Sequence, residues 1–361
     1  MILFILYEFV ASTQKGASGG NISNYLLIDK LRHHKKIGII APNIPIALVK
    51  ELESKGIFVI TEHLKFKPPF GGFKTRQWFK NTIDNLICNT PTIISELEIV
   101  VTSNGTCDLT EKLRKNQTQQ YILCRAFEDF LDHNAHYPLK EKIRRIFKKI
   151  YTAKKISKAY QTADRIVTNS EFMKGFIQNY YPEANISVLY PPIDVPLKKL
   201  KPTPSKPRIG IINPSTRKGE GIFLLLAKHH PDVDFIYFSQ HQKNYPLENV
   251  KFAGWFSDRD KLFTQIDILI APSVWSEPFG RVSVEAIRSG VPVLVSNIGG
   301  LPETVDQMFV VSEHSIQCWN KKLNWLITYP TEVEAAWSHS VMRSMKFEQK
   351  EHDEKALSIF S

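Results

Sequence analysis

Cysteine is scarce in this 361-residue chain, which has only four, at widely separated positions. They form no CxxC pair and no cysteine–histidine spacing, so the sequence predicts neither a zinc site nor a disulfide scaffold, and it favours a reducing cytoplasm. Long apolar runs are also missing. No segment approaches the roughly 20 residues of a membrane-spanning helix, so none is expected. The apolar residues 1–10 include Glu8 and lack a basic flank, so we expect a buried strand there rather than a signal peptide.

Acidic residues are in deficit, with 36 Asp and Glu against 47 Lys and Arg, for a net charge of +11. Such an excess suggests an anionic partner, which could be a nucleotide phosphate, a nucleic acid or a membrane surface. The hydrophobic share of 43% and the charged share of 23% are typical of a packed globular protein and exclude wholesale disorder. The length predicts about two domains.

Short apolar runs recur between polar, helix-like stretches along the whole chain. Near-continuous apolar strands separated by helices are typical of parallel sheets that are covered on both faces. Because the alternation occurs twice, we expect an α/β fold of two doubly wound, Rossmann-like domains. The predicted strands are 2–6, 37–41, 57–60, 98–102, 121–124, 165–168, 187–189, 208–212, 235–238, 250–253, 268–271 and 293–296.

A proline-rich stretch over 191–207 marks the seam between the two halves. Proline fixes φ and removes a backbone donor, so this stretch reads as a stiff, extended connector. The predicted organisation is an N-terminal domain over 1–195, a linker over 196–207 and a C-terminal domain over 208–335. A helical tail follows over 336–361, and its packing against the first domain is an open alternative.

The strongest local signal runs from Ala271 to Glu303. A buried strand ends at Ala271, a loop carrying Glu277 follows, and a helix bearing Glu285 begins near Gly280. Both acids can face the crevice beyond the carboxyl ends of the strands, where open α/β sheets bind ligands, and the helix start suits a phosphate. The competing interpretation makes Glu277 a helix-entry acid and Glu285 a residue on a solvated face.

This string resembles the donor-binding core of the retaining GT-B glycosyltransferases of family 4, also called glycosyl transferases group 1. Their hallmark E-x7-E is matched by Glu277 and Glu285. Residues 163–174, 190–194 and 250–255 resemble further segments of the family, and the likeness is detailed from Ala163 to Val305. It implies an acceptor-binding N-terminal domain and a nucleotide-sugar-binding C-terminal domain that face each other across a cleft.

The resemblance also implies roles for individual residues. Glu285 would bind the ribose hydroxyls of the donor, and Glu277 would contact its sugar. The diphosphate would be stabilised by Lys218, by Arg217 and by the backbone around Phe279, Gly280 and Arg281. No cofactor and no divalent metal is expected, since fixed cations and dipoles would act on the leaving group.

The loop over 211–223 offers a second phosphate cradle, in which Arg217 and Lys218 precede a helix that starts near Gly219. Lys218 matches the family lysine, whereas Asn213 and Pro214 occupy the place of the family arginine. Whether Arg217 replaces that arginine is left open, and two solvated loop cations are the alternative.

In the first domain, Gly19 and Gly20 lie between a strand and an amphipathic helix, where the family has a Gly-Gly facing the diphosphate. The surrounding residues fit no G-x-G-x-x-G dinucleotide motif. Arg125, Glu128 and His133 follow another strand and are candidates for the acceptor or sugar side, although a structural role is the alternative for each.

Two DxD strings invite a metal-dependent interpretation, which we reject. Asp232 and Asp234 precede their strand and so lie at the wrong edge of the sheet. Asp258 and Asp260 are typical helix N-terminal acids, and neither pair offers enough converging oxygens for a metal.

Residues 140–160 predict a basic amphipathic helix. Such a helix can lie on anionic lipid or can pack on its own sheet with a solvated basic face. Nucleic acid is not an expected partner, because aromatic and basic residues do not interleave as they do in such sites.

The sequence as a whole predicts a hexosyltransferase that uses a UDP- or GDP-linked sugar and a glycan or lipid-linked acceptor in cell-envelope polysaccharide synthesis. We expect it in the cytoplasm, with the inner face of the cell membrane as a further location. The alternatives are a GT-B epimerase or phosphorylase, and a non-enzymatic protein that binds polyanions or membranes.

Overall fold

The computed structural model describes residues 1–10, 19–65, 71–103, 105–114, 117–127, 129–130, 153–256 and 258–361. The chain forms two compact units, neither of which is one continuous segment. Unit 1 comprises residues 1–169, 173–191 and 353–361, and unit 2 comprises residues 170–172 and 192–352. Among the described residues, no helix combines the length and the apolar character of a membrane span.

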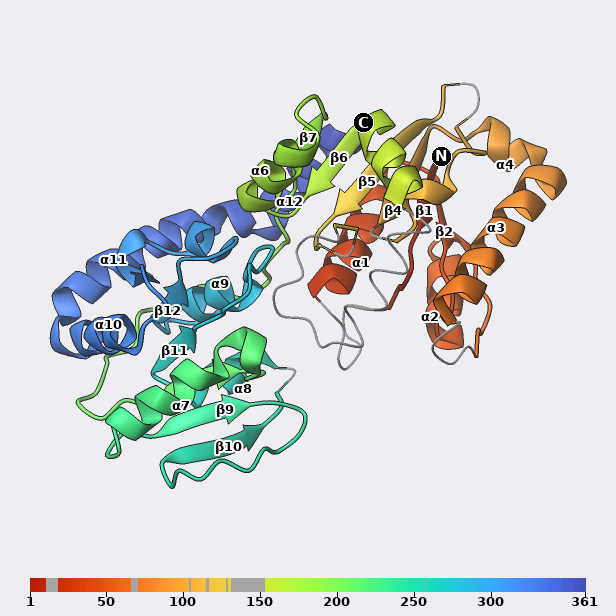
Figure 1. Ribbon diagram of the computed structural model, residues 1–361. Helices are drawn as coiled ribbons and strands as arrows, with labels where there is room; N and C mark the ends of the chain where they lie inside the picture. The colour runs from red at the N-terminus through yellow and green to blue at the C-terminus, as the bar shows by residue number, and fades with distance from the viewer. Residues whose placement is uncertain are drawn as a thin grey trace. The chain divides into compact units, whose positions relative to one another are not determined.

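Unit 1 is built on a seven-stranded parallel sheet with the strand order β3-β2-β1-β4-β5-β6-β7 (Figure 1). The buried strands β1, β2 and β4 are apolar along nearly their whole length, as expected when both faces of a sheet are covered. The strands are β1 Ile2–Ile5, β2 Ile37–Ile40, β3 Phe58–Ile60, β4 Ile99–Ser103, β5 Gln119–Cys124, β6 Arg165–Thr168 and β7 Ile186–Val188.

The helices of the N-terminal half connect these strands, and residues 153–162 are also helical. The four cysteines, all within the described residues, form no disulfide. The helices and the short 3-10 turn η1 are α1 Gly19–Leu31, α2 Ile46–Ser54, α3 Gly71–Asn89, α4 Pro91–Ser95, η1 Cys107–Leu109 and α6 Glu171–Tyr180.

Unit 2 is built on a six-stranded parallel sheet with the strand order β10-β9-β8-β11-β12-β13. The buried apolar side chains of this sheet and of the helices that pack on it form one core cluster. The strands are β8 Ile209–Ile212, β9 Phe235–Phe238, β10 Val250–Gly254, β11 Ile268–Ala271, β12 Val293–Ser296 and β13 Val310–Val311.

The helices of unit 2 alternate with its strands, and α12 passes from unit 2 into unit 1. The long tail is helical but is interrupted at the 3-10 turn η5. The elements are η2 Thr216–Lys218, α7 Glu220–His229, α8 Arg259–Thr264, α9 Arg281–Arg288, η3 Leu301–Thr304, η4 Gln307–Phe309, α10 Ile316–Thr328, α11 Pro330–Ser344, η5 Met345–Phe347 and α12 Gln349–Phe360.

All twelve predicted strands are present, each with ends within two residues of the prediction, whereas β13 was not predicted. In both sheets the strand order reverses direction once, between β1 and β4 and between β8 and β11. In doubly wound folds, ligands bind outside the carboxyl ends of the strands at this reversal. In unit 2, a ligand-binding site is therefore expected between the loops that follow β8 and β11.

Candidate active site

The loop after β8 is shaped by two residues with left-handed backbone and by a side-chain hydrogen bond between them. Asn213 adopts a left-handed conformation with φ +51°, and the Ser215 hydroxyl accepts the backbone N–H of Lys218 at 3.3 Å. Gly219 then turns with φ +75°, and a Cβ there would lie 1.8 Å from the carbonyl oxygen of Pro272. Only glycine fits this turn, because the loop after β11 crosses directly over it.

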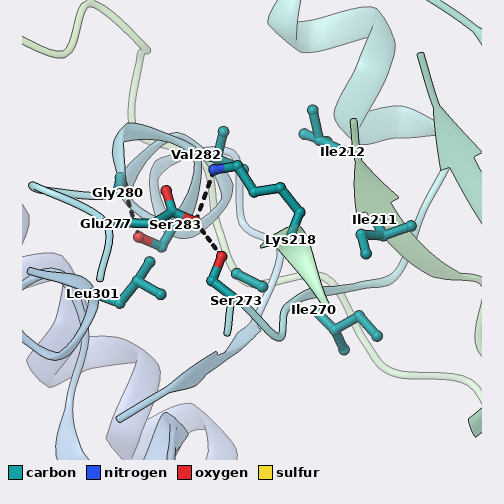
Figure 2. A pocket seen from close by; sticks show the side chains of 11 residues that line it. Ile211, Ile212, Lys218, Ile270, Ser273, Glu277, Gly280, Val282, Ser283 and Leu301 are labelled. Carbon is teal, nitrogen blue, oxygen red and sulfur yellow. Dashed lines mark hydrogen bonds and ion pairs between the residues drawn. The ribbon is translucent and has the colours of Figure 1, made fainter. Parts of the chain in front are cut away.

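The loop after β11 brings Glu277 to the same place (Figure 2). The Nζ of Lys218 lies 2.7 Å from the Oε1 of Glu277, and the buried Ser273 hydroxyl donates to the same oxygen. The Glu277 carboxylate is 13% exposed. An ammonium and a carboxylate from two different loops are therefore joined at the switch point of the sheet.

Beside this pair lies a small cavity of about 30 Å³. Figure 2 shows Lys218 reaching past the apolar strand residues toward Glu277 and Ser273. The apolar lining of this cavity comes from β8, β11, α9 and η3. It comprises Ile211, Ile212, Ile270, Ala271, Val282 and Leu301.

Glu285 lies on the second turn of α9 and is 4% exposed. Its Oε2 is 3.0 Å from the Nε of Arg259, and its Oε1 is 3.6 Å from the Nε of Arg281. The interpretation that places Glu285 on a solvated face is therefore wrong. Burial of a carboxylate is costly without partners, and the two guanidinium groups offset that cost.

Arg281 joins Glu285 to the proline-rich connector, because its Nη1 donates to the carbonyl oxygen of Pro192 at 2.9 Å. Burial lowers the pKa of Arg281, and the charge of Glu285 opposes that shift. One residue earlier, Gly280 begins the helix with φ +109°. Phe279 is buried and meets the ring of Phe347 edge-on at 5.0 Å, so it holds the start of α9 in place.

Arg217 lies next to Lys218 in the 3-10 turn η2 of the β8–α7 loop. Its guanidinium stacks 3.8 Å from the centre of the Trp275 ring, and its carbonyl oxygen accepts the N–H of Val274 at 3.0 Å. Planar guanidinium groups favour such stacking. The β8–α7 loop and the β11–α9 loop are thus joined by a backbone bond, a cation–π contact and an ion pair.

In unit 1, the Nη1 of Arg125 donates to the carbonyl oxygen of Gly20 at 3.3 Å and to the Oδ1 of Asn24 at 2.5 Å. Gly19 begins α1, and its carbonyl oxygen accepts the Ser23 hydroxyl. Arg125 therefore holds the first turn of α1. Glu128 and His133 lie outside the described residues, as do residues 140–152 of the predicted basic helix.

The DxD strings behave as expected. Asp258 caps α8 by accepting the N–H groups of Asp260 and Lys261, and Asp232 and Asp234 precede β9. The described part of the chain holds no group of three or more His, Cys, Asp or Glu side chains suited to a metal ion.

Three residues at the site were not predicted as part of it: Ser273, Trp275 and Arg259. Ser273 and Trp275 lie inside the string that contains Glu277, so their position was a usable signal. Arg259 is the middle residue of the string from Asp258 to Asp260, and the sequence carries no signal that pairs it with Glu285.

Comparison with known proteins shows which family part of unit 2 resembles. Residues 235–340 match the family model described as glycosyl transferases group 1. The predicted resemblance to this family is therefore confirmed over that part of unit 2. An uncharacterized 41.2 kDa protein in the cps region of Klebsiella pneumoniae is 34% identical over 92 residues, which cover 21% of this chain and 25% of that protein. The aligned segments span about a quarter of the length of the first curated relatives.

Two solved structures resemble nearly the whole chain. Sucrose-phosphate synthase from Thermosynechococcus elongatus has a TM-score of 0.75 at 15% identity, and the match covers 99% of this chain and 98% of that one. Anabaena Alr3699/HepE, solved in complex with UDP-glucose, has a TM-score of 0.66 at 20% identity, with 99% of both chains covered. The predicted α/β fold of two Rossmann-like domains is confirmed, and its class is GT-B.

Proposed function

We propose that this protein is a retaining hexosyltransferase of family 4, which transfers a sugar from a UDP- or GDP-linked donor to a hydroxyl of a glycan or lipid-linked glycan. The observation that carries the proposal is the 2.7 Å ion pair between Lys218 and Glu277 at the switch point of the second sheet. A nucleotide-diphosphate sugar needs a cation for its phosphates and acceptors for its sugar hydroxyls, and the pair supplies both.

The chemistry follows from where charge develops. When the bond between sugar and diphosphate breaks, negative charge accumulates on the leaving phosphate. Lys218, Arg217 and the N–H groups at the start of α9 stabilise that charge, which lowers the barrier. Retention results when the leaving phosphate accepts the acceptor's proton on the face from which it departs. These fixed cations and dipoles make a divalent metal unnecessary in the proposed reaction.

Glu285 serves the nucleotide in this proposal. Its carboxylate accepts hydrogen bonds from the ribose hydroxyls, and Arg259 and Arg281 hold it in place through their ion pairs. The complex of Alr3699/HepE with UDP-glucose supports a nucleotide-sugar donor. The relative from a cps region supports a role in polysaccharide synthesis. Three parts of the proposal rest on the sequence: Gly19 and Gly20 near the donor diphosphate, Arg125 on the acceptor or sugar side, and a membrane contact through 140–160.

Thermal denaturation with a panel of UDP- and GDP-linked sugars, with and without EDTA, tests the proposal. We expect saturable stabilisation by one donor, unchanged by EDTA and lost in Glu285→Gln. The matched control is Glu334→Gln, which changes an exposed glutamate of α11 and keeps the stabilisation. The same donor is then incubated with lipid-linked glycan acceptors, and the anomeric configuration of the product is read by NMR.

The alternatives give different results. An epimerase converts the donor without an acceptor, and a phosphorylase releases a sugar phosphate from a glycan and inorganic phosphate. A non-enzymatic polyanion binder shows shifts that vanish at moderate salt and do not discriminate among donors. Each of these outcomes contradicts the proposed transferase.

A further inference from the structure

Lys243 lies in the segment between β9 and β10, yet its side chain bonds to the β8–α7 loop. Its Nζ donates to the carbonyl oxygen of Pro214 at 2.7 Å and to the Oε1 of Glu220 at 2.6 Å. Pro214 and Glu220 flank the short segment that carries Arg217 and Lys218. One ammonium group thus ties together both ends of the loop that the proposed function assigns to the donor diphosphate.

Lys243 is itself held by the core of unit 2. The Tyr237 hydroxyl donates to the carbonyl oxygen of Lys243 at 2.8 Å and accepts its backbone N–H at 3.0 Å. Tyr237 belongs to the buried strand β9 and is 1% exposed. The backbone of Lys243 is therefore bonded on both sides of its peptide to a buried residue of the central sheet.

Tyr245 adds a second bond to the same carboxylate, because its hydroxyl donates to the Oε1 of Glu220. Its ring packs edge-on against Tyr237 at 5.0 Å. Burial raises the pKa of Glu220, but the bonds from Lys243 and Tyr245 outweigh burial and leave it below its ordinary value. Burial and then Glu220 raise the pKa of Tyr245. At neutral pH, Glu220 is therefore charged and the Tyr245 hydroxyl remains a donor.

The loop needs this support at its start, because Asn213 has a left-handed backbone there, whereas Gly219 at its end adopts that region freely. Asn213 has φ +51° and Gly219 has φ +75°, and a non-glycine residue in the left-handed region persists only when its surroundings hold it there. A single turn of 3-10 helix, Thr216–Lys218, lies between them. The bonds of Lys243 to Pro214 and Glu220 span this turn.

We propose that Lys243, assisted by Tyr245, is a positioning residue that holds the β8–α7 loop in the shape that binds the donor diphosphate. This inference rests on the proposed function and adds a residue from a different loop to it. The inference predicts that loss of the Lys243 side chain weakens binding of the phosphates. Binding of the base and ribose, whose contacts lie elsewhere in unit 2, is expected to be retained.

The test compares a nucleotide with its nucleoside. Binding of UDP and of uridine, and of GDP and guanosine, is measured by NMR titration to wild type and to Lys243→Met. We expect the diphosphate affinity to fall about tenfold, the scale of one lost charge-assisted hydrogen bond, with nucleoside affinity unchanged. Lys243→Arg recovers part of the loss, and Tyr245→Phe gives a smaller loss in the same direction.

The matched control is Lys198→Met. Lys198 is 40% exposed, against 37% for Lys243, and its Nζ lies 2.9 Å from the Oδ1 of Asp260. The Lys198→Met variant loses an ion pair of similar length, and we expect its affinities for nucleotide and for nucleoside to match those of wild type. If Lys243→Met does not fold, Tyr245→Phe carries the same comparison.

The inference is overturned if the variants bind UDP and GDP like wild type, or if nucleotide and nucleoside weaken equally, as a general loss of structure would cause. Wild-type protein that binds neither nucleotide overturns the proposed function, and this inference with it.

Discussion

A Cβ on Gly299 would lie 2.4 Å from the backbone oxygen of Glu277 and 2.5 Å from its backbone nitrogen. Gly299 also has φ +64°, and the N–H of Gly300 donates to the carbonyl oxygen of Glu277 at 2.7 Å. The Gly-Gly turn after β12 therefore packs directly against the backbone of Glu277, and no side chain fits between them.

Gly299→Ala is expected to displace Glu277 and to lower kcat/KM about 100-fold, the effect of moving a catalytic group by about 1 Å. Steady-state kinetics with the donor found in the thermal panel measure it. Gly221→Ala is the control: nothing lies within 4 Å of the added Cβ in α7, so activity stays constant and stability rises by about 0.5 kcal/mol. Equal kinetics in the two variants would refute this role of the turn.

Lys218→Met is expected to lower kcat about 100-fold or more, because it removes a cation from the place where the leaving group develops charge. Its effect on the free energy of unfolding is small, about 1 kcal/mol or less, since the Lys218 side chain is 35% exposed and its ion pair with Glu277 is screened. Chemical denaturation and single-turnover kinetics separate the two effects. A large stability loss with intact kcat would show that the pair is structural.

Arg259→Leu is expected to destabilise the fold by about 2 kcal/mol. It leaves the buried Glu285 with Arg281, 3.6 Å away, in place of a partner at 3.0 Å, and breaking one side of a buried pair is costly. Lys206→Met removes an exposed pair with Asp232 and changes stability by about 0.5 kcal/mol at most. Urea denaturation measures both, and equal losses would argue against the burial of the Glu285 charge.

The stability of unit 2 is expected to fall at acid pH through Asp267. Burial raises the pKa of this carboxyl, but its bonds to the side chain and the backbone N–H of Arg208 outweigh burial and hold it below 3.8. A lowered pKa contributes stability above pH 3.8 that disappears as pH falls through the folded-state value. Asp267→Asn therefore loses about 2 kcal/mol at neutral pH, and its difference from wild type shrinks below about pH 4. Denaturation between pH 3 and 7 checks this, and a constant difference would contradict it.

The sequence was sufficient for the strands because each is a short apolar run bounded by polar residues. It missed β13 because two residues, Val310–Val311, are too few to form a pattern. It placed Glu277 and Lys218 correctly at the ends of their strands, and adjacency of β8 and β11 then brought them together.

The partners of the site residues were beyond the sequence. Arg259 reaches Glu285 and Lys243 reaches Glu220 from elements that only the folded sheet brings close. Periodicity predicts which face of an element is buried, but not which long cationic side chain lies over which acid. For that reason the burial of Glu285 could not be decided from its helix alone.

The last helix has a consequence for how the chain is made. Ala356, Ile359 and Phe360 belong to the same buried cluster as Ile2 and Leu27, and the ring of Phe360 lies 5.4 Å from that of Tyr121. A nascent chain emerges from the ribosome with its N-terminal residues first. Residues 353–361 therefore leave the ribosome after all of unit 2, and until they emerge the apolar side chains of unit 1 that they cover stay exposed to solvent or to a chaperone.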